Sequence, residues 1–564
     1  MNLKKTCAVA LGLCMALSGC ASSSSSDEQT LTVGINTELN GVFSPLYYQT
    51  TYDGYVIDMI YQKMMRYDEN SNLQKELIKE DPVVSEDGKT ITFKLKKGIK
   101  FSDGSKLTSS DVKYTFTLMA DPSYDGRFTS SVDYLEGYSE YHDGDATDFS
   151  GIETPDDYTV IFHLAKPRVD ALSILATTGI CSDSQYNYKK GHTKKIEQDS
   201  SNPIGSGPYQ LNSYAKSEAT SLTRNPYYKD KDGQYQIDNV IIKITESSSE
   251  ISELEKGDID YIPYVQESAK ICTASKDDDL TFNSYPSNSI QYMFFNCKSG
   301  PTADQAVRQA LTYALDRQGF VDSYFDMTDA KGDVQDLKMG YVPATFGNPI
   351  SASLGDVVRG DTQVDGMTYY SYDIEKAKQL LDDAGWVVGD SGYREKDGQV
   401  LTIKFLACKN KDALDTLIPM MKKAWGDELK VDLKTSEMEF NTVIDTIYDD
   451  SAIDSWSASF YGYGFTDVEN TSLYGLFHSQ GSESDAKISD EQMDTLMEQA
   501  LYTGDQEVSK ETYLQALILQ NDICGYVPIY GLTYVNLYNK KVKGLNTSST
   551  RTWANALDTA YIKD

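Results

Sequence analysis

The stretch Ile204–Lys229 constrains the fold most, because a glycine-rich corner stands directly before a predicted β-hairpin. Gly205 and Gly207 are expected to adopt backbone angles that other residues avoid. Apolar and polar residues alternate over 209–214, and a second strand-like segment at 220–224 ends at an Asn-Pro turn signal. The sequence therefore predicts a hairpin entered through a tight corner.

A glycine-rich corner can also bind phosphate, but this one lacks the features that such a site needs. A phosphate cradle uses free backbone N–H groups at the start of a helix. Pro208 removes one N–H group, and a strand follows the corner instead of a helix. We therefore interpret the segment as a structural corner at the mouth of a sheet.

The motifs GSGPYQL and LTRNPYYK in this stretch resemble those of the solute-binding proteins of ABC importers, in the oligopeptide/dipeptide/nickel-binding family, family 5. The resemblance implies an α/β fold of the periplasmic-binding-protein-like class II (cluster C). Such a protein has two lobes, an extra domain and a ligand cleft between the lobes. It also implies the binding of an oligopeptide or peptide-like solute, without a cofactor or a metal ion.

Other segments extend the resemblance from about residue 30 to the C-terminus. Asp87-Gly88 predicts a hairpin, followed by a half-buried strand and by a helix capped near Thr108. Helices are also predicted over Asp53–Met65, Ala303–Leu315 and Tyr372–Trp386, the last with Asp373 as its cap. The implied domains are a signal peptide (1–19), a lipid-attached tether (20–29), a discontinuous lobe I (30–67, 200–289 and 515–564), an additional subdomain (68–199) and lobe II (290–514).

The first twenty residues are typical of a targeting segment. Lys4 and Lys5 precede an apolar run over 8–17 that is short for a membrane span, and the run ends in Leu-Ser-Gly-Cys20. This ending resembles a bacterial lipobox, which implies that Cys20 carries lipid and holds the protein on the outer face of the cell membrane. An ordinary cleaved signal is the alternative.

Charge and cysteine content exclude several classes of partner and site. The formal net charge is −33, which makes nucleic acid an improbable partner. Five cysteines remain after Cys20, and their odd number and wide spacing predict no disulfide framework. There is no CxxC pair, and the aspartate runs at 143–148 and 230–238 lack the terminal glutamate of an EF-hand. We therefore expect no metal site.

The candidate ligand site follows from the resemblance. In the family, a tryptophan on a lobe II strand precedes residues whose backbone pairs with an extended peptide. Trp456 fits this position, and packing in the core is its alternative role. The family's peptide-binding members carry an aspartate three residues later, where this chain has Ser459, so Asp467 is the downstream candidate for the ligand's amino group. The remaining candidates on this segment are Ser457, Ala458, Tyr461 and Tyr463.

Two glycines and a second segment complete the predicted site. Gly462 and Gly464 would let a ligand backbone approach closely, or they mark a bulge. On lobe I, the resemblance carries over Thr50, Thr51 and Tyr52, which follow a Ser-Pro turn. An unremarkable loop and helix cap is the alternative for these three residues.

The resulting hypothesis is a monomeric receptor that captures its solute between two lobes and delivers it to a permease and its ATPase subunits. The same scaffold could bind a nickel chelate or a sugar, or act as a receptor for a peptide pheromone. A hydrolase is disfavoured, because the sequence has no HExxH or GxSxG motif and only four histidines. We expect the chain not to be an enzyme.

Overall fold

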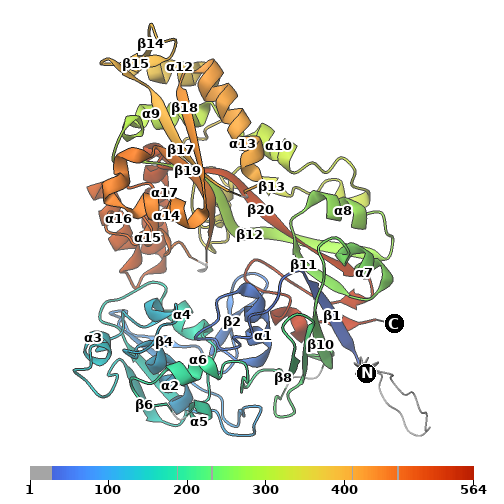
Figure 1. Ribbon diagram of the computed structural model, residues 1–564. Helices are drawn as coiled ribbons and strands as arrows, with labels where there is room; N and C mark the ends of the chain where they lie inside the picture. The colour runs from blue at the N-terminus through green and yellow to red at the C-terminus, as the bar shows by residue number, and fades with distance from the viewer. Residues whose placement is uncertain (1–27, 187, 230–232, 410, 466–468, 564) are drawn as a thin grey trace, which may run out of the picture.

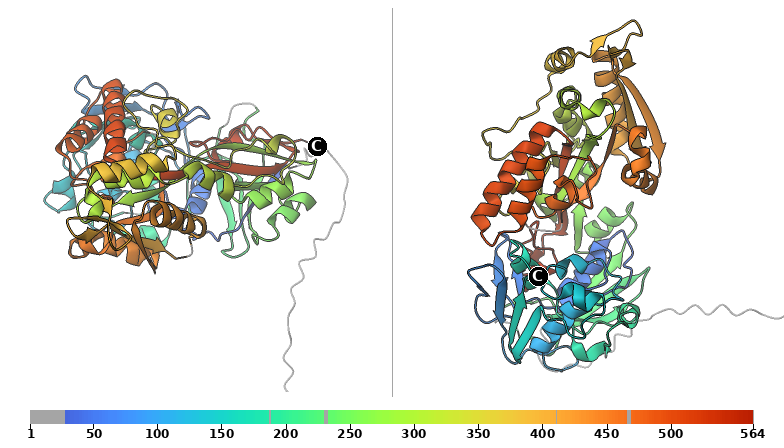
Figure 2. Two further views of the ribbon diagram at one scale, coloured as in Figure 1. Left: turned by 90° about the horizontal axis from the view of Figure 1, so that it is seen from above. Right: turned by 90° about the vertical axis from the view of Figure 1, so that its left-hand side faces the viewer.

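The computed structural model describes residues 28–186, 188–229, 233–409, 411–465 and 469–563. Two lobes lie one above the other, with a narrow connection on one side (Figure 1). We call the lower half lobe I and the upper half lobe II. Figure 1 shows both ends of the described chain in lobe I, and the right-hand view of Figure 2 shows the C-terminus in the same half. Cys20, predicted to carry lipid, and Asp467, predicted to contact the ligand, lie outside the described residues.

One sheet of eleven strands runs through both lobes. From lobe II to lobe I its strands are β18 (Asp432–Met438), β17 (Thr402–Cys408), β19 (Ala458–Gly464), β12 (Leu280–Phe295), β20 (Tyr526–Asn539), β11 (Tyr261–Val265), β1 (Thr30–Ile35), β10 (Asn239–Ile244), β9 (Ala219–Arg224) and β8 (Tyr209–Tyr214), and β13 (Gly340–Tyr341) pairs with β20.

The strands β12 and β20 connect the two lobes. They pair antiparallel over almost their whole length, from Leu280 opposite Asn539 to Phe294 opposite Tyr526. The pairing shifts register between Pro286 and Ile290, where the strands pass from one lobe to the other. A break in register bends a strand pair and weakens its ladder locally. We call this crossing of the two strands between the lobes the hinge.

Lobe I confirms the predicted hairpin, since β8 and β9 pair antiparallel. The reason predicted for the two glycines was wrong, because neither has a positive φ. Each instead permits a close approach to the end of helix α1 (Thr51–Ile60). A Cβ atom on Gly205 would lie 2.0 Å from the carbonyl oxygen of Ile60, and Gly207 donates its N–H to that oxygen at 2.7 Å.

The helix predicted over Asp53–Met65 is shorter than expected. It ends at Ile60, and Tyr61 has extended backbone angles. The chain then forms the strand β2 (Met65–Tyr67), which pairs with β3 (Leu73–Lys75). Strand pairing therefore overrides the helical pattern after Ile60. The other elements of lobe I are α7 (Glu250–Lys256), α8 (Ser268–Ala274), β21 (Val542–Lys543) and β22 (Tyr561–Ile562).

The residues between lobe I segments form a small sheet covered by helices, at the lower left of Figure 1. Asp87-Gly88 forms the predicted turn before β5, and Thr108 caps α2 in a reciprocal pair of hydrogen bonds with Asp111. The elements are β4 (Val83–Val84), β5 (Thr90–Lys94), β7 (Thr159–His163), β6 (Ile152–Asp156), α2 (Ser109–Met119), α3 (Tyr138–His142), α4 (Ala171–Thr177), α5 (Asp183–Tyr186) and α6 (Lys194–Gln198).

Lobe II packs its helices on both faces of its end of the large sheet (Figure 1). Asp373 caps the helix predicted over Tyr372–Trp386, as expected. The helices are α9 (Gln305–Tyr313), α10 (Arg317–Tyr324), α11 (Gly355–Arg359), α12 (Ile374–Asp383), α13 (Ala413–Met421), α14 (Phe440–Tyr448), α15 (Leu473–Phe477), α16 (Glu491–Leu501) and α17 (Gln506–Ile523), and β14 (Val387–Val388), β15 (Arg394–Lys396) and β16 (Gln399–Val400) form a small sheet at the top.

The boundary expected at residue 515 is wrong, because it falls inside α17. The buried side chains of Tyr513, Ala516 and Leu517 pack in the same core as the lobe II strands. The chain therefore returns to lobe I later, along β20. No helix within the described ranges is long and apolar enough to cross a membrane.

Candidate functional site

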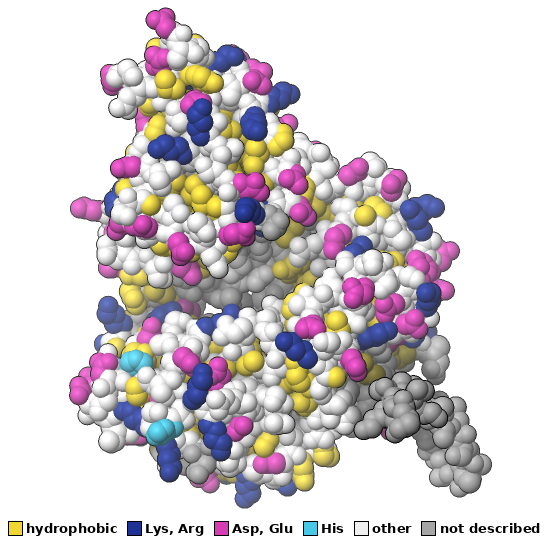
Figure 3. Space-filling model, viewed as in Figure 1, with side chains coloured by type: hydrophobic (Ala, Val, Ile, Leu, Met, Phe, Trp, Pro, Cys, Tyr) yellow, Lys and Arg dark blue, Asp and Glu magenta, His cyan; other side chains and the backbone are white. Residues whose placement is uncertain are grey.

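A cavity of about 990 Å³ lies between the two lobes, and we call it the interlobe cavity. Figure 3 shows the surface hollowed at this level. Residues of α1, α4 and the loop at 45–49 line it from below, and the end of β19 lines it from above. Its size lies at the upper end of the range of ligand pockets, about 300–1,000 Å³. The two lobes thus enclose a space that suits a ligand larger than one amino acid.

The start of α1 presents the predicted lobe I residues. Thr50 caps the helix, because its hydroxyl accepts a hydrogen bond from the N–H of Asp53 at 3.2 Å. Thr51 lines the interlobe cavity and also a smaller pocket beside it, which Tyr52 lines as well. The cap thus fixes the end of the helix that faces the cleft. The structure brings Thr51 and Tyr52 to the cleft and gives Thr50 a structural contact.

Two arginines on the lobe I side line the interlobe cavity. The guanidinium of Arg127 lies 4.8 Å from the ring centres of both Tyr48 and Phe128. Arg168 pairs with Asp170, with 2.6 Å between Nε and Oδ1. Stacking on aromatic rings holds the Arg127 side chain in place while its charge stays in the cavity. Asp170 also lines the cavity and offsets the charge of Arg168, so Arg127 supplies the positive charge of the two arginines.

The wall on lobe II is formed by the end of β19. Gly462, Tyr463, Gly464 and Phe465 line the interlobe cavity. A Cβ atom on Gly464 would meet no atom within 4 Å, so the backbone is open to the cavity there. The pairing of β12 with β19 has no register shift, which excludes a bulge at the two glycines. The carboxylates of Glu469 and Glu483 line the same side, and Glu483 accepts a hydrogen bond from the hydroxyl of Tyr463 at 2.7 Å.

The earlier part of the predicted segment lies inside lobe II. Trp456 is 2% exposed and does not line the interlobe cavity. Its ring packs edge-on against Phe294, with centroids 5.9 Å apart, and its indole N–H has no hydrogen-bond partner in the described part of the protein. This environment gives Trp456 a packing role. A contact between Trp456 and a ligand stays a prediction.

The neighbours of Trp456 are buried as well. The hydroxyl of Ser459 donates to the carbonyl oxygen of Leu406 at 2.9 Å. Ser457, Ala458 and Tyr461 are also buried, whereas Tyr463 reaches the cavity. The structure therefore brings only the far end of the predicted segment to the cleft. Ser459 does not line the interlobe cavity.

A buried carboxylate supports the lobe II wall from behind. Asp485 accepts hydrogen bonds from the hydroxyls of Tyr292 at 2.6 Å and Tyr448 at 2.7 Å. Burial raises the pKa of Asp485, and these hydroxyls act against that rise. Tyr292 belongs to β12, so the network ties the segment that carries Glu483 to the central sheet.

The two lobes also touch on the side opposite the hinge. The N–H of Val169 donates to the carbonyl oxygen of Leu501 at 3.1 Å, and the side chain of Gln506 donates to the carbonyl oxygen of Val169 at 3.0 Å. The ammonium of Lys166 lies 4.6 Å from the ring centre of Tyr502. We call this contact between residues 166–169 and 501–506 the latch. Hinge and latch together close the cavity on two sides.

The family model described as "Bacterial extracellular solute-binding proteins, family 5 Middle" matches residues 72–484, which is more than half of the chain. The chain belongs to family 5. Its class of protein is therefore that of the extracellular solute-binding proteins, as the resemblance implied.

Family 5 relatives resemble the chain over most of its length. The dipeptide-binding protein of Escherichia coli is 26% identical over 521 residues, which cover 88% of each chain. The structure of the substrate-binding protein CtaP of Listeria monocytogenes has a TM-score of 0.78 at 21% identity, and covers 95% of this chain and 100% of that one. The oligopeptide-binding protein AppA of Bacillus subtilis, solved with a nonapeptide, has a TM-score of 0.70 at 22% identity, with coverage of 95% and 100%. These likenesses establish the family 5 fold.

Several residues that line the cleft of this family 5 protein were not predicted from its sequence. Arg127, Arg168, Glu469 and Glu483 line the interlobe cavity, although no motif marks them. Their only signal is charge within loops of mixed polarity. Among the described residues no group of three or more His, Cys, Asp or Glu side chains could hold a metal ion.

Proposed function

We propose that this protein captures an oligopeptide in the interlobe cavity and delivers it to the permease of an ABC importer. The observation that carries the proposal is the cavity of about 990 Å³ between two lobes that are joined by a hinge of two strands. Relatives named as oligopeptide- and dipeptide-binding proteins support the choice of ligand. Hinge motion would open and close the cavity around the peptide.

The open edge of β19 supports pairing with a peptide backbone. On one side β19 pairs with β12 from Ala458 to Gly464. On the other side β17 pairs only as far as Ser459, and no strand in the described chain covers the rest of that edge. An extended peptide can add to such an edge, with main-chain bonds that do not depend on its sequence. Each bond would contribute about 0.5–1.5 kcal/mol net.

The charged groups of the cavity suit the two ends of a peptide. Glu469 and Glu483 lie on the lobe II wall, and Arg127 lies on the lobe I wall. We propose that a lobe II carboxylate pairs with the ligand's amino group in the place of the family's aspartate, with Asp467 as a further candidate. Removing one partner of such a desolvated charge pair would weaken binding by about 2–5 kcal/mol, in large part because the other charge is left buried and unpaired.

Membrane attachment through a lipid on Cys20 is the second part of the proposal. The supporting observation is the sequence Leu-Ser-Gly-Cys20 after an apolar run, followed by a serine-rich tether. The protein would act as a monomer at the outer face of the cell membrane. It would leave the peptide unchanged, and the transporter's ATPase subunits would hydrolyse ATP. The variant Cys20→Ala should move to the soluble fraction, and unchanged membrane retention would refute lipid anchoring.

Mass spectrometry of ligands that copurify with the protein tests the proposed function. We expect peptides to be released from the protein by mild denaturation. Added peptides should also raise the unfolding temperature of the ligand-free protein, because a ligand that binds only the folded state stabilises it. Recovery of a metal chelate or a sugar, with no stabilisation by diverse peptides, would contradict the proposal.

A further inference from the structure

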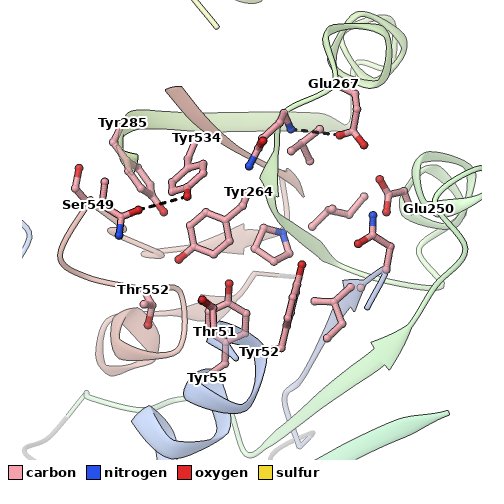
Figure 4. A pocket seen from close by; sticks show the side chains of 18 residues that line it. Thr51, Tyr52, Tyr55, Glu250, Tyr264, Glu267, Tyr285, Tyr534, Ser549 and Thr552 are labelled. Atoms are coloured by element: carbon pink, nitrogen blue, oxygen red, sulfur yellow. Dashed lines mark hydrogen bonds between the residues drawn. The ribbon is translucent and has the colours of Figure 1, made fainter. Parts of the chain in front are cut away.

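A second pocket of about 320 Å³ lies beside the interlobe cavity at the hinge, and we call it the hinge pocket. It shares Thr51, Tyr55, Asn288, Ser549 and Thr552 with the interlobe cavity, so a ligand bound between the lobes can reach it. Figure 4 shows the side chains that line it. Its size suits one long side chain rather than a whole peptide.

Five tyrosines surround the hinge pocket. Tyr285 and Tyr534 stand directly opposite each other on the two hinge strands. The ring of Tyr264 meets that of Tyr534 edge-on at 4.7 Å between centroids and stacks with Tyr55 at 6.0 Å. Tyr52 closes the set from α1. Rings from α1, β11, β12 and β20 thus converge on one space.

The backbone of Tyr264 is strained. Its φ is +57°, a value that bulky residues rarely adopt, and it lies where the pairing of β11 with β20 shifts register. The N–H of Tyr264 donates to the side-chain oxygen of Asn536 at 3.1 Å, which holds this conformation. Strain of about 1–3 kcal/mol persists where the surrounding structure requires it, and such residues cluster at binding sites. Here the strained conformation directs an aromatic ring into the pocket (Figure 4).

Charge in the hinge pocket favours a cation. Glu250 and Glu267 line it at the end away from Tyr285, and no lysine or arginine is among its described lining residues (Figure 4). Both carboxylates share the ammonium of Lys270, at 2.5 Å from Glu250 and 3.0 Å from Glu267. One ammonium offsets only one of the two negative charges. The pocket therefore combines aromatic faces with uncompensated negative charge.

We propose that the hinge pocket binds a cationic side chain of the ligand, of the lysine or arginine type. Aromatic rings attract a cation through their faces, and the carboxylates at the far end add Coulomb attraction. The proposal rests on the proposed function, since the cation belongs to a peptide bound in the interlobe cavity. A net charge of −33 also attracts cationic peptides toward the protein.

Matched peptides test the preference by isothermal titration calorimetry on the full protein in detergent. The probes are alanine pentapeptides that carry lysine at each position in turn, and the same set with norleucine or phenylalanine. At one position lysine should bind about tenfold more tightly than norleucine, the size expected for a desolvated cation among aromatic rings. Equal affinity at every position, or tighter binding of phenylalanine, would overturn the proposal.

Variants show whether the hinge pocket is the source of the preference. Glu267→Gln removes one charge from the pocket, and Tyr52→Leu removes one ring. Either variant should reduce the lysine preference to about threefold or less, and in Glu267→Gln the affinity for the norleucine peptides should stay within about twofold. Glu255→Gln and Tyr372→Leu are matched controls at exposed positions outside the pocket, and both should keep the full preference.

The outcomes separate this proposal from the proposed function. If peptides bind but Glu267→Gln and Tyr52→Leu both keep the full lysine preference, the hinge pocket is not the cation site and the receptor function stands. If no peptide of any set binds, both proposals fail. If Tyr52→Leu loses all binding and also unfolds at a lower temperature, it does not report on the pocket. Glu267→Gln then decides the question, because it changes no packing volume.

Discussion

Replacing Trp456 with alanine separates a packing role from a ligand contact. Its ring is 2% exposed, lies edge-on against Phe294 and faces neither cavity. Deleting a buried tryptophan side chain costs about 3–5 kcal/mol, through lost transfer energy and the cavity that remains. We therefore expect Trp456→Ala to lower the stability of lobe II by about this amount.

Trp456→Phe is the matched control. It keeps a ring against Phe294, and the indole N–H that it removes has no partner in the described structure, so no hydrogen bond is lost. Its cost should be less than half that of alanine. Urea unfolding followed by circular dichroism measures both shifts from the midpoint and slope. A stable Trp456→Ala variant that has lost peptide affinity would refute the packing argument and establish a ligand contact.

Three further predictions concern the corner at Gly207, the buried carboxyl group of Asp111 and the latch. Gly207→Ala places a Cβ atom 2.6 Å from backbone atoms of Ile60 and should displace α1. We expect thermal unfolding to show a loss of stability of about 1–3 kcal/mol, and calorimetry to show weaker peptide binding. Burial raises the pKa of Asp111 to about 6, above its ordinary value of 3.8, so the folded protein holds this proton more tightly and stability should fall as the pH rises from 4 to 6. Because other carboxyl groups titrate in the same range, urea unfolding should show this fall as the difference between the protein and Asp111→Asn. Gln506→Ala removes the latch bond to Val169, and stopped-flow measurements should show about two- to tenfold faster peptide release.

Local signals in the sequence predicted elements whose geometry is set by neighbouring residues. The hairpin of β8 and β9, the Asp87-Gly88 turn, the cap of α2 at Thr108 and the cap at Asp373 all formed as expected. Each depends on residues within a few positions along the chain. Such short-range chemistry can be recognised without knowledge of the fold.

Features that depend on distant contacts could not be predicted in the same way. Helix α1 ends at Ile60 because Met65–Tyr67 joins a strand pair. Gly205 is needed because it lies against this helix end, 145 residues away along the chain from Ile60. The latch joins segments more than 300 residues apart. The spacing of apolar residues along the sequence contains no information about these distant contacts.

The candidate site was predicted in part for the same reason. The resemblance pointed to the segment from Trp456 to Tyr463, and the structure brings only its far end to the interlobe cavity. The path of β19 decides this, because its first residues pair on both sides inside the sheet. Arg127 and Glu483 carry no motif, and only the folded chain brings them to one cavity.

The distance between the lobes tests the account most directly. Spin labels at Glu86→Cys and Val508→Cys, both exposed near the latch, would report it by double electron–electron resonance. With a bound peptide we expect a single short distance, as in the closed cavity described here. Without peptide we expect a longer, broader distribution, because the hinge opens and the latch separates. An identical distance distribution in both states would contradict capture by closure of the lobes.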